Sequence, residues 1–151
     1  MRKIDIEKQI NINATVEQVW QVFSDFKAYV DWSPTIRFLS ATLEDGKSTA
    51  VLLQQPDGKK MTMYPKVLRL VENNELRWRG RLFLPGLFDG EHYFILKRLP
   101  NGTTQFIQGE HFDGLLVPLF SKMILGPTQK GFEAFNQALK RKVEEQVTMG
   151  L

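Results

Sequence analysis

Residues 88–116 read FDGEHYFILKRLPNGTTQFIQGEHFDGLL, and in this stretch two runs with the alternation of β-strands meet at a turn. The turn, Pro100-Asn101-Gly102, suits a three-residue hairpin loop with its glycine in the left-handed conformation. Counting outward from it predicts four cross-strand pairs on one face: Arg98 with Thr104, Leu96 with Phe106, Phe94 with Gln108, and His92 with Glu110. That face is mostly apolar but carries an imidazole opposite a carboxylate, which is more typical of a ligand-cavity wall than of a plain core.

The residues before this hairpin predict a strand, two short helices and a series of turns. Residues 2–12 alternate as a strand does, and Thr15 with Gln18 can form the capping box of a short helix. A second short helix is expected at about residues 25–30. Between residues 36 and 113, turn signals at intervals of about ten residues predict six strands in an antiparallel meander.

From residue 114 to about residue 146, apolar residues recur at the spacing of an α-helix, and we expect a break or a kink at Gly126-Pro127. The order of elements predicts an α+β fold in one domain, residues 1–151. We expect a bent seven-stranded antiparallel sheet wrapped around the long C-terminal helix, since this helix alone can cover the apolar face of the sheet. A sheet curled around a helix leaves a cavity.

The composition narrows the function classes. The chain has no cysteine, which excludes thiol catalysis, thiolate metal sites and disulfides. Its two histidines, His92 and His111, fall on opposite strand faces, so we expect no metal, and no motif indicates a tightly held cofactor. The net charge of +3 is spread over the chain and needs no nucleic acid to explain it. Without a signal-peptide pattern or a run long enough to span a bilayer, we expect a cytoplasmic monomer or homodimer with no integral membrane association.

Three segments carry a resemblance to a known superfamily: INATVEQVWQVFSDFKAYVDWSP (12–34), LRWRGRLFLPGLFDGEHYFIL (76–96) and EHFDGLLVPLF (110–120). They resemble the START-like, Bet v 1-like (SRPBCC) superfamily, in particular a bacterial branch described as polyketide cyclase/dehydrase-like. This resemblance implies the helix-grip fold and a hydrophobic cavity for a lipid, steroid, polyketide, aromatic or isoprenoid molecule. The superfamily includes enzymes, carriers and chaperone co-factors, so the fold does not choose among them.

The candidate site is the polar part of the inner sheet face. His92 and Glu110 could anchor a ligand oxygen or move a proton, or they could be a satisfied pair that only holds the sheet register. Gln108 lies between apolar neighbours and needs a hydrogen-bond partner. The expected apolar wall consists of six aromatic residues: Tyr29, Trp32, Trp78, Phe94, Phe112 and Phe135.

Three functions follow from this site. The first is binding of a small hydrophobic molecule, with the three polar side chains orienting one end of the ligand. The second is a cyclase or dehydratase that uses His92 and Glu110 as acid and base. The third is a protein-interaction or co-chaperone-like module, which a cavity filled by side chains would favour. The loop Leu84–Phe88 could gate the cavity or pack beneath the helix.

Overall fold

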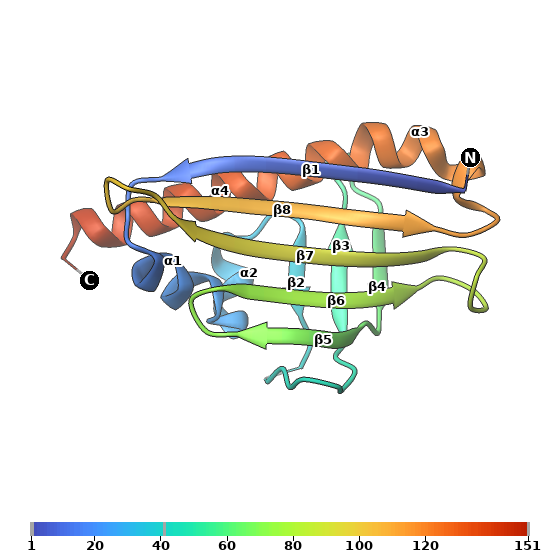
Figure 1. Cartoon of the computed structure of the whole chain (residues 1–151), viewed down its shortest axis with the longest axis horizontal. Coiled ribbons are helices and arrows are strands. Elements are labelled where there is room, and N and C mark those ends of the chain that lie inside the picture. The colour runs from blue at the N-terminus through green and yellow to red at the C-terminus, as the bar shows by residue number, and fades with distance from the viewer. Residues whose placement is uncertain (1, 41, 151) are drawn as a thin grey trace.

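Two antiparallel sheets and one long helical segment make up the structure, a computed structural model that describes residues 2–40 and 42–150 (Figure 1). The larger sheet has five strands, in the order β1 (Lys3–Ile12), β8 (Thr104–Asp113), β7 (Asp89–Arg98), β6 (Glu75–Arg81), β5 (Lys66–Val71). The smaller sheet has three strands, β2 (Ile36–Phe38), β3 (Val51–Gln54) and β4 (Lys60–Met63).

The predicted single sheet of seven strands is therefore wrong, since the described residues form sheets of five and three strands. The run between the turns near residues 58 and 72 is two strands, β4 and β5, separated by Tyr64 and Pro65. Proline has no N–H for a sheet ladder, so pairing stops there and the chain passes from the small sheet to the large one. The sheets stay connected because the N–H of Thr49 donates to the carbonyl of Pro65 at 2.9 Å.

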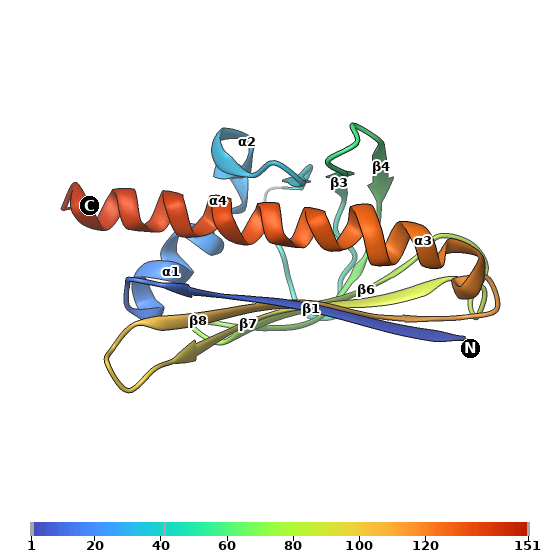
Figure 2. The ribbon, with the colours of Figure 1, turned by 90° about the horizontal axis from the view of Figure 1, so that it is seen from above.

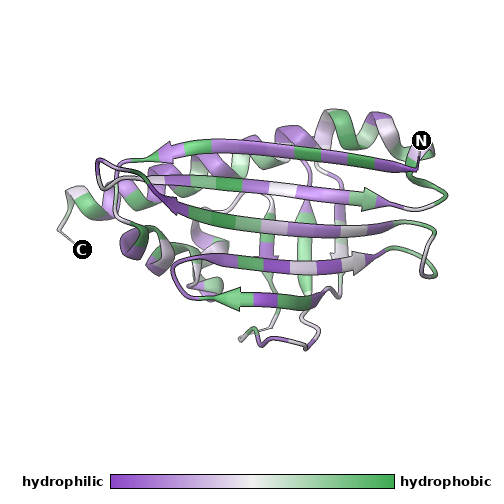
Figure 3. Cartoon of the chain, in the orientation of Figure 1, coloured by the Kyte–Doolittle hydropathy of each residue, from purple (hydrophilic) through white to green (hydrophobic). Residues whose placement is uncertain are grey.

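The predicted hairpin register is confirmed. β7 and β8 pair in register with His92 opposite Glu110 and Phe94 opposite Gln108. At the turn, the N–H of Leu99 donates to the carbonyl of Thr103 at 2.9 Å, and Gly102 has a φ of 84°. Alternating hydrophobic and hydrophilic bands run along the strands of the larger sheet (Figure 3), as a sheet with one covered and one solvated face requires.

The two short helices between the first two strands are also confirmed. α1 (Val16–Phe23) begins with the expected capping box: the Gln18 N–H donates to Thr15 Oγ1 at 3.2 Å, and the Thr15 N–H donates to Gln18 Oε1 at 2.9 Å. After a 3₁₀ turn, Phe26–Ala28, comes α2 (Tyr29–Trp32).

The C-terminal helical segment is continuous but bent. A 3₁₀ turn, Val117–Phe120, leads into α3 (Ser121–Met123), a π-helical turn (Ile124–Thr128) and α4 (Gln129–Thr148). Pro127 lies inside the π turn, where its missing N–H interrupts the regular α-helical ladder. Figure 2 shows that α4 and the strands β3 and β4 lie on the same side of the five-stranded sheet.

The core has two parts along the length of α4. The larger cluster is strongly aromatic and combines α1, α2, the sheet and α4; its aromatic members are Trp20, Phe23, Phe26, Tyr29, Trp78, Phe94, Phe106 and Phe135. The smaller cluster lies around α3 and the π turn and contains Ile6, Phe88, Phe112, Val117, Ile124 and Phe132. The imidazole of His92 contacts both clusters, with ring centroids 4.5 Å from Phe94 and 4.9 Å from Phe132.

Candidate functional site

A cavity of about 390 Å³ lies between the inner face of the large sheet, the small sheet and the helical segment. Most of its wall is aliphatic or aromatic, from Leu53, Met61, Met63, Leu82, Phe88, Phe112, Met123 and Phe132. Polar side chains reach it at two places: one group from β7 and β8 at the inner end, and one group from the β3–β4 hairpin and the π turn. The cavity is thus an apolar space with hydrogen-bonding groups concentrated at its ends.

Two glycines leave room for the side chains of neighbouring strands in the cavity wall. Gly80 and Gly90 form a cross-strand pair between β6 and β7, and both line the cavity. A Cβ atom at Gly90 would overlap the Glu110 carboxylate, and one at Gly80 would press on the end of Met63. The Glu110 carboxylate and the Met63 side chain therefore occupy the positions that a Cβ atom at Gly90 or Gly80 would take.

The inner polar group is centred on His92, whose side chain is almost fully buried. Its Nδ1 lies 3.2 Å from Oε1 of Glu110, and its Nε2 lies 3.0 Å from Oε1 of Gln108. Both ring nitrogens are therefore occupied by side chains from the neighbouring strand β8. The ring also stacks on Phe94 and lies 5.3 Å from the Trp78 ring, so its orientation is fixed by packing as well as by hydrogen bonds.

The hydrogen-bond network assigns the tautomer of His92. The amide nitrogen of Gln108 donates to Asn136 Oδ1 at 2.9 Å and to the Phe132 carbonyl at 3.3 Å. Since both partners are acceptors, the Gln108 oxygen must face the imidazole, and Nε2 of His92 must carry a hydrogen. The other ring nitrogen, Nδ1, is left to face the Glu110 carboxylate. The second carboxylate oxygen of Glu110 has no hydrogen bond among the described residues, so it can accept one from a molecule in the cavity.

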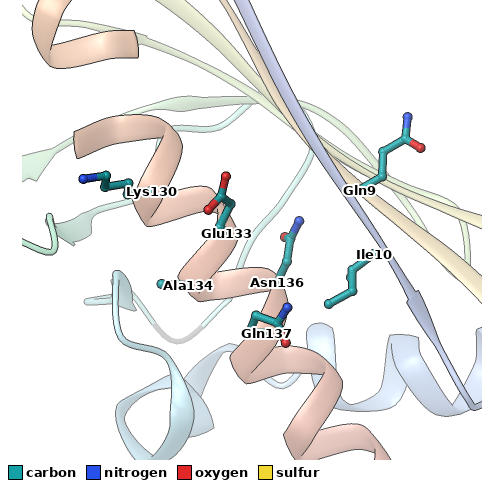
Figure 4. Close-up of a pocket in the computed structure, with 7 residues that line it drawn as sticks. All are labelled: Gln9, Ile10, Lys130, Glu133, Ala134, Asn136 and Gln137. Atoms are coloured by element: carbon teal, nitrogen blue, oxygen red, sulfur yellow. The ribbon is translucent and has the colours of Figure 1, made fainter. Parts of the chain in front are cut away.

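Asn136 is the site residue that the sequence analysis missed. It lies on α4, is almost fully buried, and also donates from Nδ2 to the Lys8 carbonyl of β1 at 3.2 Å. Figure 4 shows it between α4 and β1, beside a second hollow of about 340 Å³. The available signal was a polar residue directly after Phe135, within the apolar stripe of the helix.

The structure separates the nine predicted ligand-binding residues into two groups. His92, Gln108, Glu110 and Phe112 line the cavity. The other five pack against one another in the aromatic cluster beside it: Tyr29, Trp32, Trp78, Phe94 and Phe135. A ligand role for the nine stays a prediction.

Two of the aromatic residues show how polar atoms are placed in this cluster. The Tyr29 hydroxyl donates to the Phe23 carbonyl at 2.6 Å, and burial, with Asp25 nearby, raises the pKa of Tyr29 well above its ordinary value. The indole N–H of Trp32 is buried and has no hydrogen-bond partner among the described residues. Tyr29 is therefore satisfied within the protein, whereas Trp32 keeps an unused donor.

The loop after β6 is buried at one residue and exposed at another, and a gating role stays a prediction. Phe88 is buried and lines the cavity, while Leu84 is 74% exposed. The loop is tied to the segment after β8, since the N–H groups of Leu115 and Leu116 donate to the carbonyls of Gly86 and Leu87 at 3.1 and 2.9 Å.

Over residues 3–144 the sequence matches the family described as polyketide cyclase / dehydrase and lipid transport. The chain belongs to this family. Membership confirms the resemblance to a polyketide cyclase-like SRPBCC branch, and the sheet with its long C-terminal helix fits the helix-grip fold. No protein of curated function matches the chain in sequence.

Solved structures share the fold of this family member at low sequence identity. The Zhui aromatase/cyclase from Streptomyces sp. R1128 superposes with a TM-score of 0.74 at 17% identity, over 96% of both chains. A START superfamily protein from Mycobacterium smegmatis gives a TM-score of 0.69 at 20% identity, over 93% of this chain and 97% of that one. The di-domain ARO/CYC StfQ from the steffimycin biosynthetic pathway gives 0.76 at 11% identity, over 97% of this chain and 53% of that one.

Two further findings concern metals and membranes. Within residues 2–40 and 42–150, no three His, Asp or Glu side chains gather into a group that could hold a metal ion. No helix in the same ranges is long and apolar enough to cross a membrane.

Proposed function

We propose that this protein binds a small hydrophobic molecule in the cavity between the five-stranded sheet and the helical segment. The observation that carries the proposal is an apolar cavity of about 390 Å³ whose inner end holds His92, Gln108 and Glu110. This volume lies at the small end of the range for ligand pockets, roughly 300–1,000 Å³. In the proposed complex, Phe112 contacts the apolar body of the ligand, and the three polar side chains orient one hydrogen-bonding group.

The aromatic cluster packs against the side of His92 and its neighbours that faces away from the cavity. Trp78 and Phe94 contact the His92 ring directly, while Tyr29, Trp32 and Phe135 pack in the layer between α2 and α4. The interaction-module hypothesis expected a cavity filled by side chains. Because the described residues leave an open cavity, we favour a bound small molecule over that alternative.

A substitution at Gly131 on α4 tests the binding proposal. Gly131 lines the cavity, and a Cβ atom there would meet only Thr35 Cγ2 at 3.6 Å and Pro56 Cδ at 3.7 Å, which are ordinary contacts. Gly131→Leu should occupy part of the cavity without unfolding the helix, and Gly131→Ala is the matched control. We expect the leucine variant to lose the hydrophobic compounds that mass spectrometry finds in the natively purified protein, and the alanine variant to keep them.

The same experiment has a clear negative outcome. If the wild-type protein carries no such compound and binds no fatty acid, sterol or aromatic polyketide in calorimetry, the binding proposal fails. It also fails if Gly131→Leu binds as tightly as Gly131→Ala.

A second candidate function is a cyclase or dehydratase. The observation that favours it is the His92–Glu110 pair at the cavity wall, where hydrogen bonds and packing fix the orientation of the imidazole ring. His92→Gln should then abolish turnover of a polyketide substrate while ligand affinity survives. A protein that only binds its ligand would have no turnover to lose.

A further inference from the structure

The mouth of the cavity carries two lysines, Lys59 and Lys60, where the β3–β4 hairpin faces the π turn. We propose that they bind an anionic group of the ligand, a carboxylate or a phosphate. This inference rests on the proposed function and narrows the ligand to an amphipathic acid, whose apolar body lies in the cavity and whose charge lies at the mouth.

Neither lysine has an ion-pair partner among the described residues. Of the ion pairs formed by the described residues, none includes Lys59 or Lys60. The nearest acidic residue along the hairpin, Asp57, instead accepts the backbone N–H of Lys59 at 3.0 Å. This Asx-type contact holds the turn and does not place the carboxylate on a lysine amine.

The rest of the mouth is neutral. Its polar side chains are Thr35, Gln54, Gln55 and Thr128, and the Gln55 amide donates to Thr128 Oγ1 at 3.2 Å across from hairpin to helix. The other two ionisable side chains that line the cavity, His92 and Glu110, pair with each other at the inner end. The residues that line the mouth therefore include two lysines without an ion-pair partner in the described part of the chain, beside an apolar space.

This distribution also sets the direction of the ligand. An acidic group placed at the inner end would meet Glu110, which is hydrogen-bonded to His92 and has no second cation within ion-pair distance among the described residues. At the mouth, the same group meets two cations and remains partly hydrated. A hydroxyl or phenol group suits the inner end, because its O–H can donate a hydrogen bond to the Glu110 carboxylate there.

The test compares three naphthalene compounds of similar size: 2-naphthoic acid, its methyl ester and 2-naphthyl phosphate. Each exposed ion pair contributes only a modest free energy of binding. Two lysines should therefore make the wild-type protein bind the charged compounds roughly ten-fold more tightly than the ester, measured by calorimetry at low salt. The preference should shrink as salt is added. The double variant Lys59→Gln/Lys60→Gln should lose it while it binds the ester as before.

The control is Lys27→Gln/Lys97→Gln, which removes the same charge from exposed positions outside the cavity lining and should keep the preference. Tighter binding of the acid alone, or of the phosphate alone, assigns the anion as carboxylate or phosphate. Equal affinity of the wild-type protein for ester and acids, or a preference that survives in Lys59→Gln/Lys60→Gln, overturns this inference and leaves the proposed function standing. Failure of the wild-type protein to bind any of the three compounds also overturns this inference, whereas the proposed function is decided separately by the compounds found in the natively purified protein.

Discussion

Replacing Gln108 with leucine should destabilise the protein because it orphans two buried polar groups. The side chain is only 1% exposed, and its amide joins His92, Asn136 and the Phe132 carbonyl. In Gln108→Leu, the Nε2–H of His92 loses its acceptor and Oδ1 of Asn136 loses its donor. The Phe132 carbonyl keeps the N–H of the following helical turn, so it is not orphaned.

The magnitude follows from these two groups. Each buried unsatisfied group costs about 1–3 kcal/mol. Burial of a leucine side chain returns part of that cost, about 1.5–3 kcal/mol at full burial. We therefore expect a net loss of about 2 kcal/mol in the free energy of unfolding. For a chain of this size, such a loss corresponds to a fall in melting temperature of roughly 4–8 °C.

Urea denaturation, read as the transition midpoint at constant slope, measures the change. Gln105→Leu is the control, since Gln105 lies on the same strand but its amide bonds to Gln9 at the surface, and it should change stability by less than about 0.5 kcal/mol. Gln108→Leu combined with Asn136→Leu should cost less than the sum of the single variants by about 1 kcal/mol. The reasoning would be refuted if Gln108→Leu unfolded at the same urea concentration as the wild-type protein. It would also be refuted if the losses of unfolding free energy in the two single variants added up to the loss in the double variant.

Three further predictions concern single residues. Burial opposes the ionisation of Glu91, but hydrogen bonds from two arginines outweigh it and lower its pKa. The contribution of ionised Glu91 to stability is therefore fully present above its unfolded-state pKa of about 4.3, and it is lost as the pH falls through the lower pKa of the folded state. Urea midpoints of Glu91→Gln should therefore depend less on pH below about 4.3 than those of the wild-type protein. An unchanged pH profile would contradict this. Gly90→Ala should displace the Glu110 carboxylate from His92 and cost about 1 kcal/mol in urea, and in a Glu110→Ala background this cost should vanish. Gly131→Ala should raise stability in thermal denaturation by up to about 1 kcal/mol, as expected for glycine replaced inside a helix, and a lower melting temperature would show that its neighbours cannot accept the Cβ.

The confirmed parts of the sequence analysis depend on local chemistry. The turn at Gly102 sets the pairing of β7 with β8, because a hairpin loop of known length leaves one register. The capping box that starts α1 uses Thr15 and Gln18, only three residues apart. The π-helical turn around Pro127, where the regular α-helix is interrupted, follows from a missing N–H. Each of these features is decided by a few consecutive residues.

The sheet division that the sequence analysis got wrong, and the placement of the site residues that it left open, depend on contacts between layers. The sheet divides near Pro65, and the sequence there shows turn and strand signals without saying which sheet each strand joins. Five predicted wall residues pack in the aromatic cluster and do not line the cavity, as with Trp32 and Phe135 at 5.3 Å between ring centroids. Periodicity predicts which side of an element is inside, but it does not separate a filled interior from an open one.

By itself, the sequence determined the order of helices and strands, although not the division of the strands into two sheets. It also determined the pairing of His92 with Glu110 on the inner face. Both follow because turn residues and side-chain alternation act over short distances. Only the tertiary structure decided the partner of Gln108, which is Asn136 on α4, 28 residues further along the chain. It also decided where the interior stays open, because the cavity is lined by residues from both sheets and from the helical segment. A cavity is the volume left after distant elements pack, and no local pattern encodes that volume.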